Sequence, residues 1–132
     1  LPQADLQFAR VHEQCAAARL AALGSNQVAV SNLRQWLIAH MGPQVPRRAQ
    51  AARALGISER TLARRLSEQA QTFDNLLDDV RKEMALLAVS ASERSLVDIA
   101  HSLGFAEAST FYRAFRRWTG RTPVCWRRNS VM

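Results

Sequence analysis

The sequence predicts an all-α fold, and three observations support this. Apolar residues recur every three or four positions along most of the 132 residues, which is the spacing of one face of a helix. No stretch alternates apolar and polar residues with the period of two that a half-buried β-strand shows. Gly and Pro interrupt the pattern where short connections between helices would lie. The length fits one compact domain or two very small ones.

The N-terminal third contains two predicted helices. Residues 4–22 have the helical apolar spacing, and the pattern ends at Gly24. Residues 28–41 repeat it, and the segment GPQVP (42–46) stops it. The chain begins with Leu rather than Met, so we expect it to be a piece of a longer protein.

The middle of the chain predicts two short helices and one long helix. The first is 47–54, and the second begins after Ser58, a residue type that caps helix N-termini, and runs to about Gln69. Thr72 then caps a linker helix over 73–89. The predicted buried stripe of this linker helix consists of Phe73, Leu76, Leu77, Val80, Met84 and Leu87.

The C-terminal part predicts three further helices. Ser95 and Asp98 resemble a capping box, with Asp in place of the usual Glu or Gln, and they mark the next helix start. Two helices then lie on either side of Gly104, and Pro123 opens a last short one.

Two segments repeat one another: AARALGISERTLARRL (51–66) and IAHSLGFAEASTFYRAF (99–115). Ala52, Leu55, Gly56, Ile57, Leu62, Arg64 and Leu66 in the first match Ala100, Leu103, Gly104, Phe105, Phe111, Arg113 and Phe115 in the second. Each copy predicts a helix, a tight turn with Gly, and a second helix, which is the helix-turn-helix arrangement. The predicted units are 46–69 and 95–118. The alternative is a helical hairpin repeat that serves packing alone.

The second helix of each repeat is two-faced. At roughly 100° per residue, Phe111, Ala114, Phe115 and Trp118 share one sector, and Ser109, Arg113 and Arg116 lie opposite. In the first repeat, Leu62 and Leu66 face inward while Arg60, Arg64 and Ser67 face outward. Arg65 lies nearer the inward side, so we expect it to be structural and to pair with the acidic linker helix. We therefore expect the apolar sector to bind the helix to its own unit and the arginines to face a partner.

The net charge of +7 favours an anionic partner, and its distribution indicates which part meets that partner. Residues 47–132 carry fifteen Lys and Arg against nine Asp and Glu. Outward Arg and short polar groups suit the major groove of DNA, where Arg can bond guanine O6 and N7. For Arg64 and Arg113, base contact and phosphate contact are equally open. RNA binding and a protein-interaction bundle are the alternatives, although Tyr112 is the only outward aromatic residue available for RNA.

Residues 33–128 resemble the DNA-binding domain of the AraC/XylS family of bacterial transcription regulators. The motifs are LGISERTLARRL, the spaced residues Phe73, Leu77 and Arg81, and DIAHSLGFAEASTFYRAFRRWTGRTP. The resemblance implies a homeodomain-like fold of seven helices plus an N-terminal extra helix, with 28–132 as the DNA-binding domain. It also implies that 1–27 are the tail of a missing sensing domain or an interdomain linker helix.

The resemblance implies a function in which two recognition helices read adjacent major-groove segments of promoter DNA. We expect the linker helix, roughly 24 Å long at ~1.5 Å per residue, to set the units about one DNA turn apart, near 34 Å. RNA polymerase is a further expected partner, an effector would act through the missing N-terminal domain, and the fragment should be a monomer. The predicted DNA-binding residues are Glu59, Arg60, Ala63, Arg64, Ser67, Ala108, Ser109, Thr110, Tyr112, Arg113, Arg116 and Arg117.

The sequence departs from the family pattern mainly in the first unit. Arg48 stands where an apolar residue is usual, Ala51 replaces a larger Val, and Ala70 replaces a frequent Gly. In the linker helix, Ala88 and Val89 replace a bulkier pair. We therefore expect the first unit to be the less stable of the two.

Residue types for other functions are scattered. Cys15 and Cys125 lie too far apart to indicate a zinc site or a disulfide framework, and His12 with Cys15 lacks a third ligand. No catalytic triad or carboxylate pair is visible, so we expect no enzyme, no metal and no cofactor. The sequence contains no membrane span or signal peptide, and we expect a cytoplasmic protein.

Overall fold

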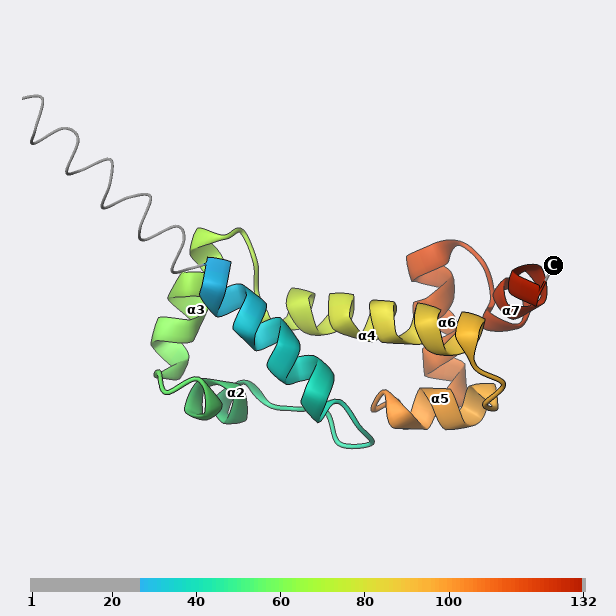
Figure 1. Cartoon of the computed structure of the whole chain (residues 1–132), viewed down its shortest axis with the longest axis horizontal. Coiled ribbons are helices and arrows are strands. Elements are labelled where there is room, and N and C mark those ends of the chain that lie inside the picture. The colour runs from blue at the N-terminus through green and yellow to red at the C-terminus, as the bar shows by residue number, and fades with distance from the viewer. Residues whose placement is uncertain (1–26, 132) are drawn as a thin grey trace, which may run out of the picture.

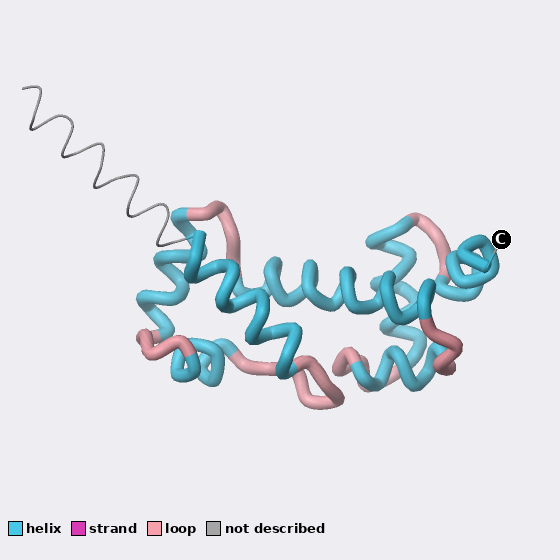
Figure 2. Tube along the Cα trace, in the orientation of Figure 1, coloured by secondary structure: helices cyan, strands magenta, loops and turns pink. Residues whose placement is uncertain are grey.

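The structure, a computed structural model, describes residues 27–131, which form helices and loops with no β-strand among them (Figure 2). The all-α prediction is confirmed for this part of the chain. The predicted helix at 4–22, with His12 and Cys15, lies outside the described residues. The described helices are the helix at 27–40, α2 (Arg48–Ala54), α3 (Glu59–Glu68), α4 (Phe73–Ala91), α5 (Leu96–Ser102), α6 (Ala108–Thr119) and α7 (Pro123–Val131).

The helices form two units at opposite ends of α4 (Figure 1). The helix at 27–40, α2 and α3 lie at one end, and α5, α6 and α7 lie at the other. We call these sets of helices the first and the second unit. Helix α4 has 19 residues, which gives a length of about 28 Å. It ends at Ala91, two residues beyond the predicted end, so one continuous helix joins the units.

The predicted N-caps are confirmed. The hydroxyl oxygen of Ser58 accepts a hydrogen bond from the Thr61 backbone N–H at 3.0 Å, and that of Thr72 accepts one from Asn75 at 3.1 Å. The Ser95 hydroxyl likewise accepts from the Asp98 N–H at 3.1 Å. Each bond satisfies a backbone donor that the first helical turn leaves unpaired. The structure gives no returning bond from the Asp98 side chain, so the predicted capping box is half formed.

Helix α4 turns nearly opposite faces to the two units. In the first unit, Phe73, Leu76 and Val80 pack against buried residues of the helix at 27–40, α2 and α3. In the second unit, Ala85 and Val89 pack against α5 and α6. At ~100° per residue, the second pair lies roughly opposite the first three. The buried stripe of α4 therefore changes sides between Val80 and Ala85.

This change of sides makes one prediction wrong. Leu87 was predicted to continue the buried stripe of the linker helix, but its side chain is 69% exposed. Leu87 continues the sector of Phe73 and Val80 into the region where the second unit covers the other face of α4. The apolar period of a helix gives one buried face, so it does not predict that the helix packs against different partners along its length.

The two repeats form the same turn, as predicted. Ala52 and Ala100 are buried at the matching positions. The carbonyl of Ala52 accepts from the Ile57 N–H at 3.0 Å, and that of Ala100 accepts from Phe105 at 3.1 Å. Each turn contains a Gly with positive φ, +72° at Gly56 and +85° at Gly104. A residue with a Cβ would be strained at either position.

Ala70, two residues after the end of α3, has a backbone conformation that favours glycine. The N–H of Gln71 donates to the Leu66 carbonyl at 2.8 Å, and that of Ala70 donates to Ser67 at 3.0 Å. These bonds form a Schellman motif, in which Gly is the usual residue at the Ala70 position. Ala70 has a φ of +55°. The family's Gly is therefore replaced at a position where its freedom is needed.

Candidate nucleic-acid interface

The outward face of α3 carries the predicted first-unit contacts. Leu62 and Leu66 are buried, as the helical wheel predicts, and they hold the helix on the first unit. The opposite side chains are exposed: Glu59, Arg60, Ala63, Arg64 and Ser67. Among the described residues, no ion pair holds Arg60 or Arg64, so both guanidinium groups are available to an external anion.

Glu59 differs from the rest of this set because it has a partner within the protein. Its Oε1 lies 3.5 Å from Nε of Arg48, and both side chains are more than half exposed. Arg48 replaces the apolar residue usual in the family, and it lies on the surface rather than in the core. An exposed pair of this kind adds little stability. It does place a second cationic side chain beside the N-terminus of α3.

The outward face of α6 carries the predicted second-unit contacts. Phe111, Ala114 and Phe115 are buried, so the inward sector is confirmed. Ala108 is half-buried, and Tyr112 is at the border of exposure at 36%. The exposed members of the predicted set on this helix are Ser109, Thr110, Tyr112, Arg113, Arg116 and Arg117.

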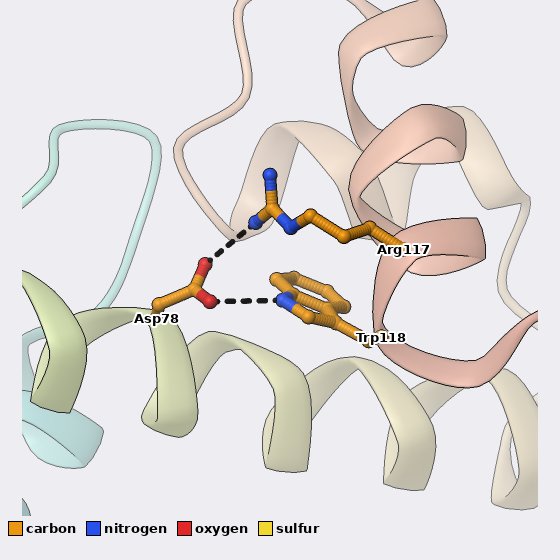
Figure 3. Close-up of polar contacts among 3 residues, drawn as sticks. All are labelled: Asp78, Arg117 and Trp118. Carbon is orange, nitrogen blue, oxygen red and sulfur yellow. Dashed lines mark hydrogen bonds and ion pairs between the residues drawn. The ribbon is translucent and has the colours of Figure 1, made fainter.

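The arginines of α6 are of two kinds. Among the described residues, Arg113 and Arg116 have no ion-pair partner. The Nη2 of Arg117 instead donates to Oδ1 of Asp78 on α4 at 3.1 Å (Figure 3). Asp78 also accepts from Nε1 of Trp118 at 3.0 Å. Arg117 is therefore partly engaged inside the protein, whereas Arg113 and Arg116 are directed only to solvent.

Two polar residues of the structure were missed or misplaced by sequence reasoning. Asp78 was not singled out, because its partners lie 39 and 40 residues away in the sequence. Arg65 was expected to be structural and to pair with the acidic linker helix. It is half-buried, but no described ion pair joins it to α4, where Glu83 pairs with Arg34 and Asp78 pairs with Arg117.

Arg81 of α4 lies where the two units approach each other. Its guanidinium carbon is 4.6 Å from the ring centroid of Phe105, a cation–π contact with the second unit. A Cβ on Gly104 would contact the side chain of Val45 and would lie 3.0 Å from Nη2 of Arg81. Burial lowers the pKa of Arg81, and the charge of nearby Asp78 opposes that shift. The guanidinium nevertheless stays protonated in a protein.

The arrangement is suited to binding an anion. Two exposed helix faces present arginines whose planar guanidinium groups can bond phosphate oxygens or the edge of guanine. Within residues 27–131 there is no cluster of three His, Cys, Asp or Glu side chains that could hold a metal ion. In the same part of the chain, no helix is both long enough and apolar enough to cross a bilayer.

Comparisons with known proteins agree with this site. A family model described as a helix-turn-helix domain matches residues 51–129. The ornithine utilization regulator of Pseudomonas aeruginosa is 42% identical over 115 residues, which cover 87% of this chain and 34% of that protein. The chain thus spans about a third of the length of this curated relative.

Two solved structures show the same fold. A transcriptional regulator from Chromobacterium violaceum, described as an AraC-type DNA-binding domain-containing protein, superposes with a TM-score of 0.73 at 18% identity, covering 83% of this chain and 97% of that one. The DNA-binding domain of AdpA, solved in complex with a target DNA, gives a TM-score of 0.65 at 23% identity, with coverage of 76% and 90%. The matched motifs, the family model and the fold together show that this chain belongs to the AraC/XylS family of DNA-binding transcription regulators.

Proposed function

We propose that the protein regulates transcription by reading two adjacent major-groove segments of a promoter, one with α3 and one with α6. The observation that carries the proposal is the matched pair of outward faces, one on α3 and one on α6, at the two ends of α4. Arg64 and Arg113 occupy equivalent positions of the two repeats, and both are exposed. The two units differ in sequence, so one chain should read an asymmetric site.

The contacts divide into two classes by their chemistry. We assign base contacts to Arg64 and Arg113, with Arg60, Ser109, Thr110 and Tyr112 beside them, because these side chains surround the centres of the outward faces. Ala63 and Ala108 offer only a methyl group, which suits the methyl of thymine. Arg116 at the end of α6 is assigned to phosphate, where neutralisation supplies affinity without sequence information.

The rest of the proposal concerns the longer protein. We propose that 28–132 is the DNA-binding domain, that 1–27 belongs to a linker or to the end of a preceding sensing domain, and that an effector acts through that domain. RNA polymerase is the proposed protein partner on the promoter. We further propose a cytoplasmic protein that binds and does not catalyse, and a monomeric state for this fragment.

The experiment is selection of binding sites from random duplex DNA with the purified chain. We expect an asymmetric consensus with two conserved segments separated by about one helical turn. Competition with single-stranded RNA of the same length is the control for the RNA-binding alternative. Enrichment of no consensus, or equal competition by the RNA, would contradict the proposal.

A further inference from the structure

The contact between Asp78 and α6 joins the linker helix to the end of the second recognition helix. Both oxygens of the Asp78 carboxylate are used: Oδ1 accepts from Arg117 at 3.1 Å and Oδ2 from Trp118 at 3.0 Å. Figure 3 shows the two side chains reaching from neighbouring positions of α6 to this one carboxylate. At ~100° per residue, Asp78 shares a face of α4 with Ala85 and Val89, which carry the second unit.

Of the two α6 side chains, Trp118 is held by its neighbours, whereas Arg117 is exposed. The indole ring of Trp118 packs edge-on against Phe105, with ring centroids 6.4 Å apart. The guanidinium carbon of Arg117 lies 6.0 Å from the centroid of the Trp118 ring. Arg81, which lies three residues after Asp78 on α4, also contacts the ring of Phe105. The carboxylate of Asp78 therefore joins α4 to a packed ring and to a guanidinium group whose side chain is 66% exposed.

Hydrogen bonds and apolar packing constrain the units differently. Apolar contacts such as those of Ala85 and Val89 are non-directional, so they hold two helices together without fixing the position of any one pair of atoms. Hydrogen bonds to a carboxylate are short, directional and stronger than neutral ones. The hydrogen bonds of Asp78 are directional contacts between α4 and α6, and they constrain the angle between these two helices.

We propose that Asp78 is a positioning residue that sets the orientation of α6 relative to α3, and thereby the separation of the two DNA segments that one molecule accepts. This inference rests on the proposed function. Asp78 touches no DNA in this scheme. It acts through Arg117 and Trp118, and its effect is on the spacing of the site rather than on the bases within either segment.

The experiment compares Asp78→Asn with Asp79→Asn on three DNA duplexes. One carries the selected site, and the other two have one base pair added or removed between the two segments, which shifts one segment by ~3.4 Å and rotates it. Both substitutions remove one negative charge from neighbouring positions of α4. Asp79 is exposed and makes none of the contacts described for Asp78, so its variant controls for the change in net charge.

The wild-type protein and Asp79→Asn should bind the altered spacings about tenfold more weakly than the selected site, a penalty comparable to one mismatched base pair. Asp78→Asn should reduce this penalty to about threefold or less, because α6 can then adopt other angles. Trp118→Phe keeps a ring against Phe105 but cannot donate the hydrogen bond, and it should relax the spacing in the same way.

Several outcomes would overturn the inference. If Asp78→Asn and Trp118→Phe lose affinity equally on all three duplexes, the contact is merely structural. If both keep the wild-type spacing preference, it positions nothing. Should Asp78→Asn fail to fold, Trp118→Phe decides alone. A wild-type protein with a consensus but no spacing preference overturns the inference and leaves the proposed function intact, whereas a wild-type protein with no consensus overturns both.

Discussion

The first and second units form the same turn on different cores. The buried core of the second unit contains Phe105, Phe111 and Phe115, with ring centroids 5.5 Å apart for the first pair and 5.9 Å for the second. The buried residues that α2 contributes to the first unit are Ala51 and Ala52. The comparison teaches that one turn geometry can be stabilised by aromatic rings within the helix-turn-helix repeat or by apolar side chains of a helix outside the repeat.

In the first unit, the packing from outside the repeat comes from the helix at 27–40. Its Leu33 and Leu37 are fully buried against α2, α3 and α4. The two small alanines of α2 belong to the same buried cluster as these leucines. The lower stability of the first unit stays a prediction, and this helix is the feature on which it depends.

The largest expected effect separates the two cores. Phe111→Ala should lower the free energy of unfolding of the second unit by about 3–5 kcal/mol, because a fully buried ring is lost. Amide hydrogen exchange should show α5 and α6 losing protection before α2 and α3. The control is Arg113→Ala, an exposed change on the same helix that should leave the melting temperature nearly unchanged. Simultaneous loss of protection in both units would contradict the separation.

The two turn glycines should differ next. Gly56→Ala places a Cβ in open space and should cost about 1–2 kcal/mol through its positive φ alone. Gly104→Ala carries the same strain and adds overlap with Val45 and Arg81, which should cost a further 1–3 kcal/mol or so. Denaturant unfolding of both variants gives the two values. Equal destabilisation would mean that Val45, in the loop before α2, does not restrict the space around Gly104.

A smaller difference is expected between neighbouring arginines of α6. Arg116→Ala should reduce the slope of log K against log salt by about one phosphate contact. Arg117→Ala should change the slope less, because its guanidinium is bound to Asp78. Titration of random duplex DNA at several salt concentrations measures both slopes. If the two variants lose the same slope, Arg117 leaves Asp78 when DNA binds.

The smallest effect concerns the residues that follow the C-terminal ends of the two recognition helices. Helix α6 ends at Gly120 with a φ of +78°, whereas α3 is followed by Ala70 at +55°. Ala70→Gly should stabilise the protein by about 0.5–1 kcal/mol. The substitution removes the strain of the left-handed conformation, and this gain is partly offset because glycine gives the unfolded chain more conformational freedom. Ala63→Gly within α3 is the matched control and should destabilise by about 1 kcal/mol. A lower melting temperature for Ala70→Gly than for the wild type would contradict the claim that Ala70 is strained.

Much of this fold could be predicted from local sequence rules, and the predictions that were wrong share one cause. Caps such as Ser58 and Thr72, the Gly turns and the inward sector of α6 depend on residues within one or two turns, so they could be predicted. The exposure of Leu87, the partners of Asp78 and the lack of a described ion pair between Arg65 and α4 depend on how helices far apart in the sequence meet. The DNA contacts themselves stay predictions, because exposure makes a side chain available without identifying what it binds.

The central claim is that both units read bases, each with its own recognition helix. The most direct test measures the affinity of the wild type, Arg64→Ala and Arg113→Ala for every single-base variant of the selected site and for random DNA. We expect two sensitive segments, each relaxed by only one variant, with a loss of roughly 1–3 kcal/mol on the selected site. If either variant weakens selected and random DNA equally, that arginine is a phosphate contact, and the claim fails for its unit.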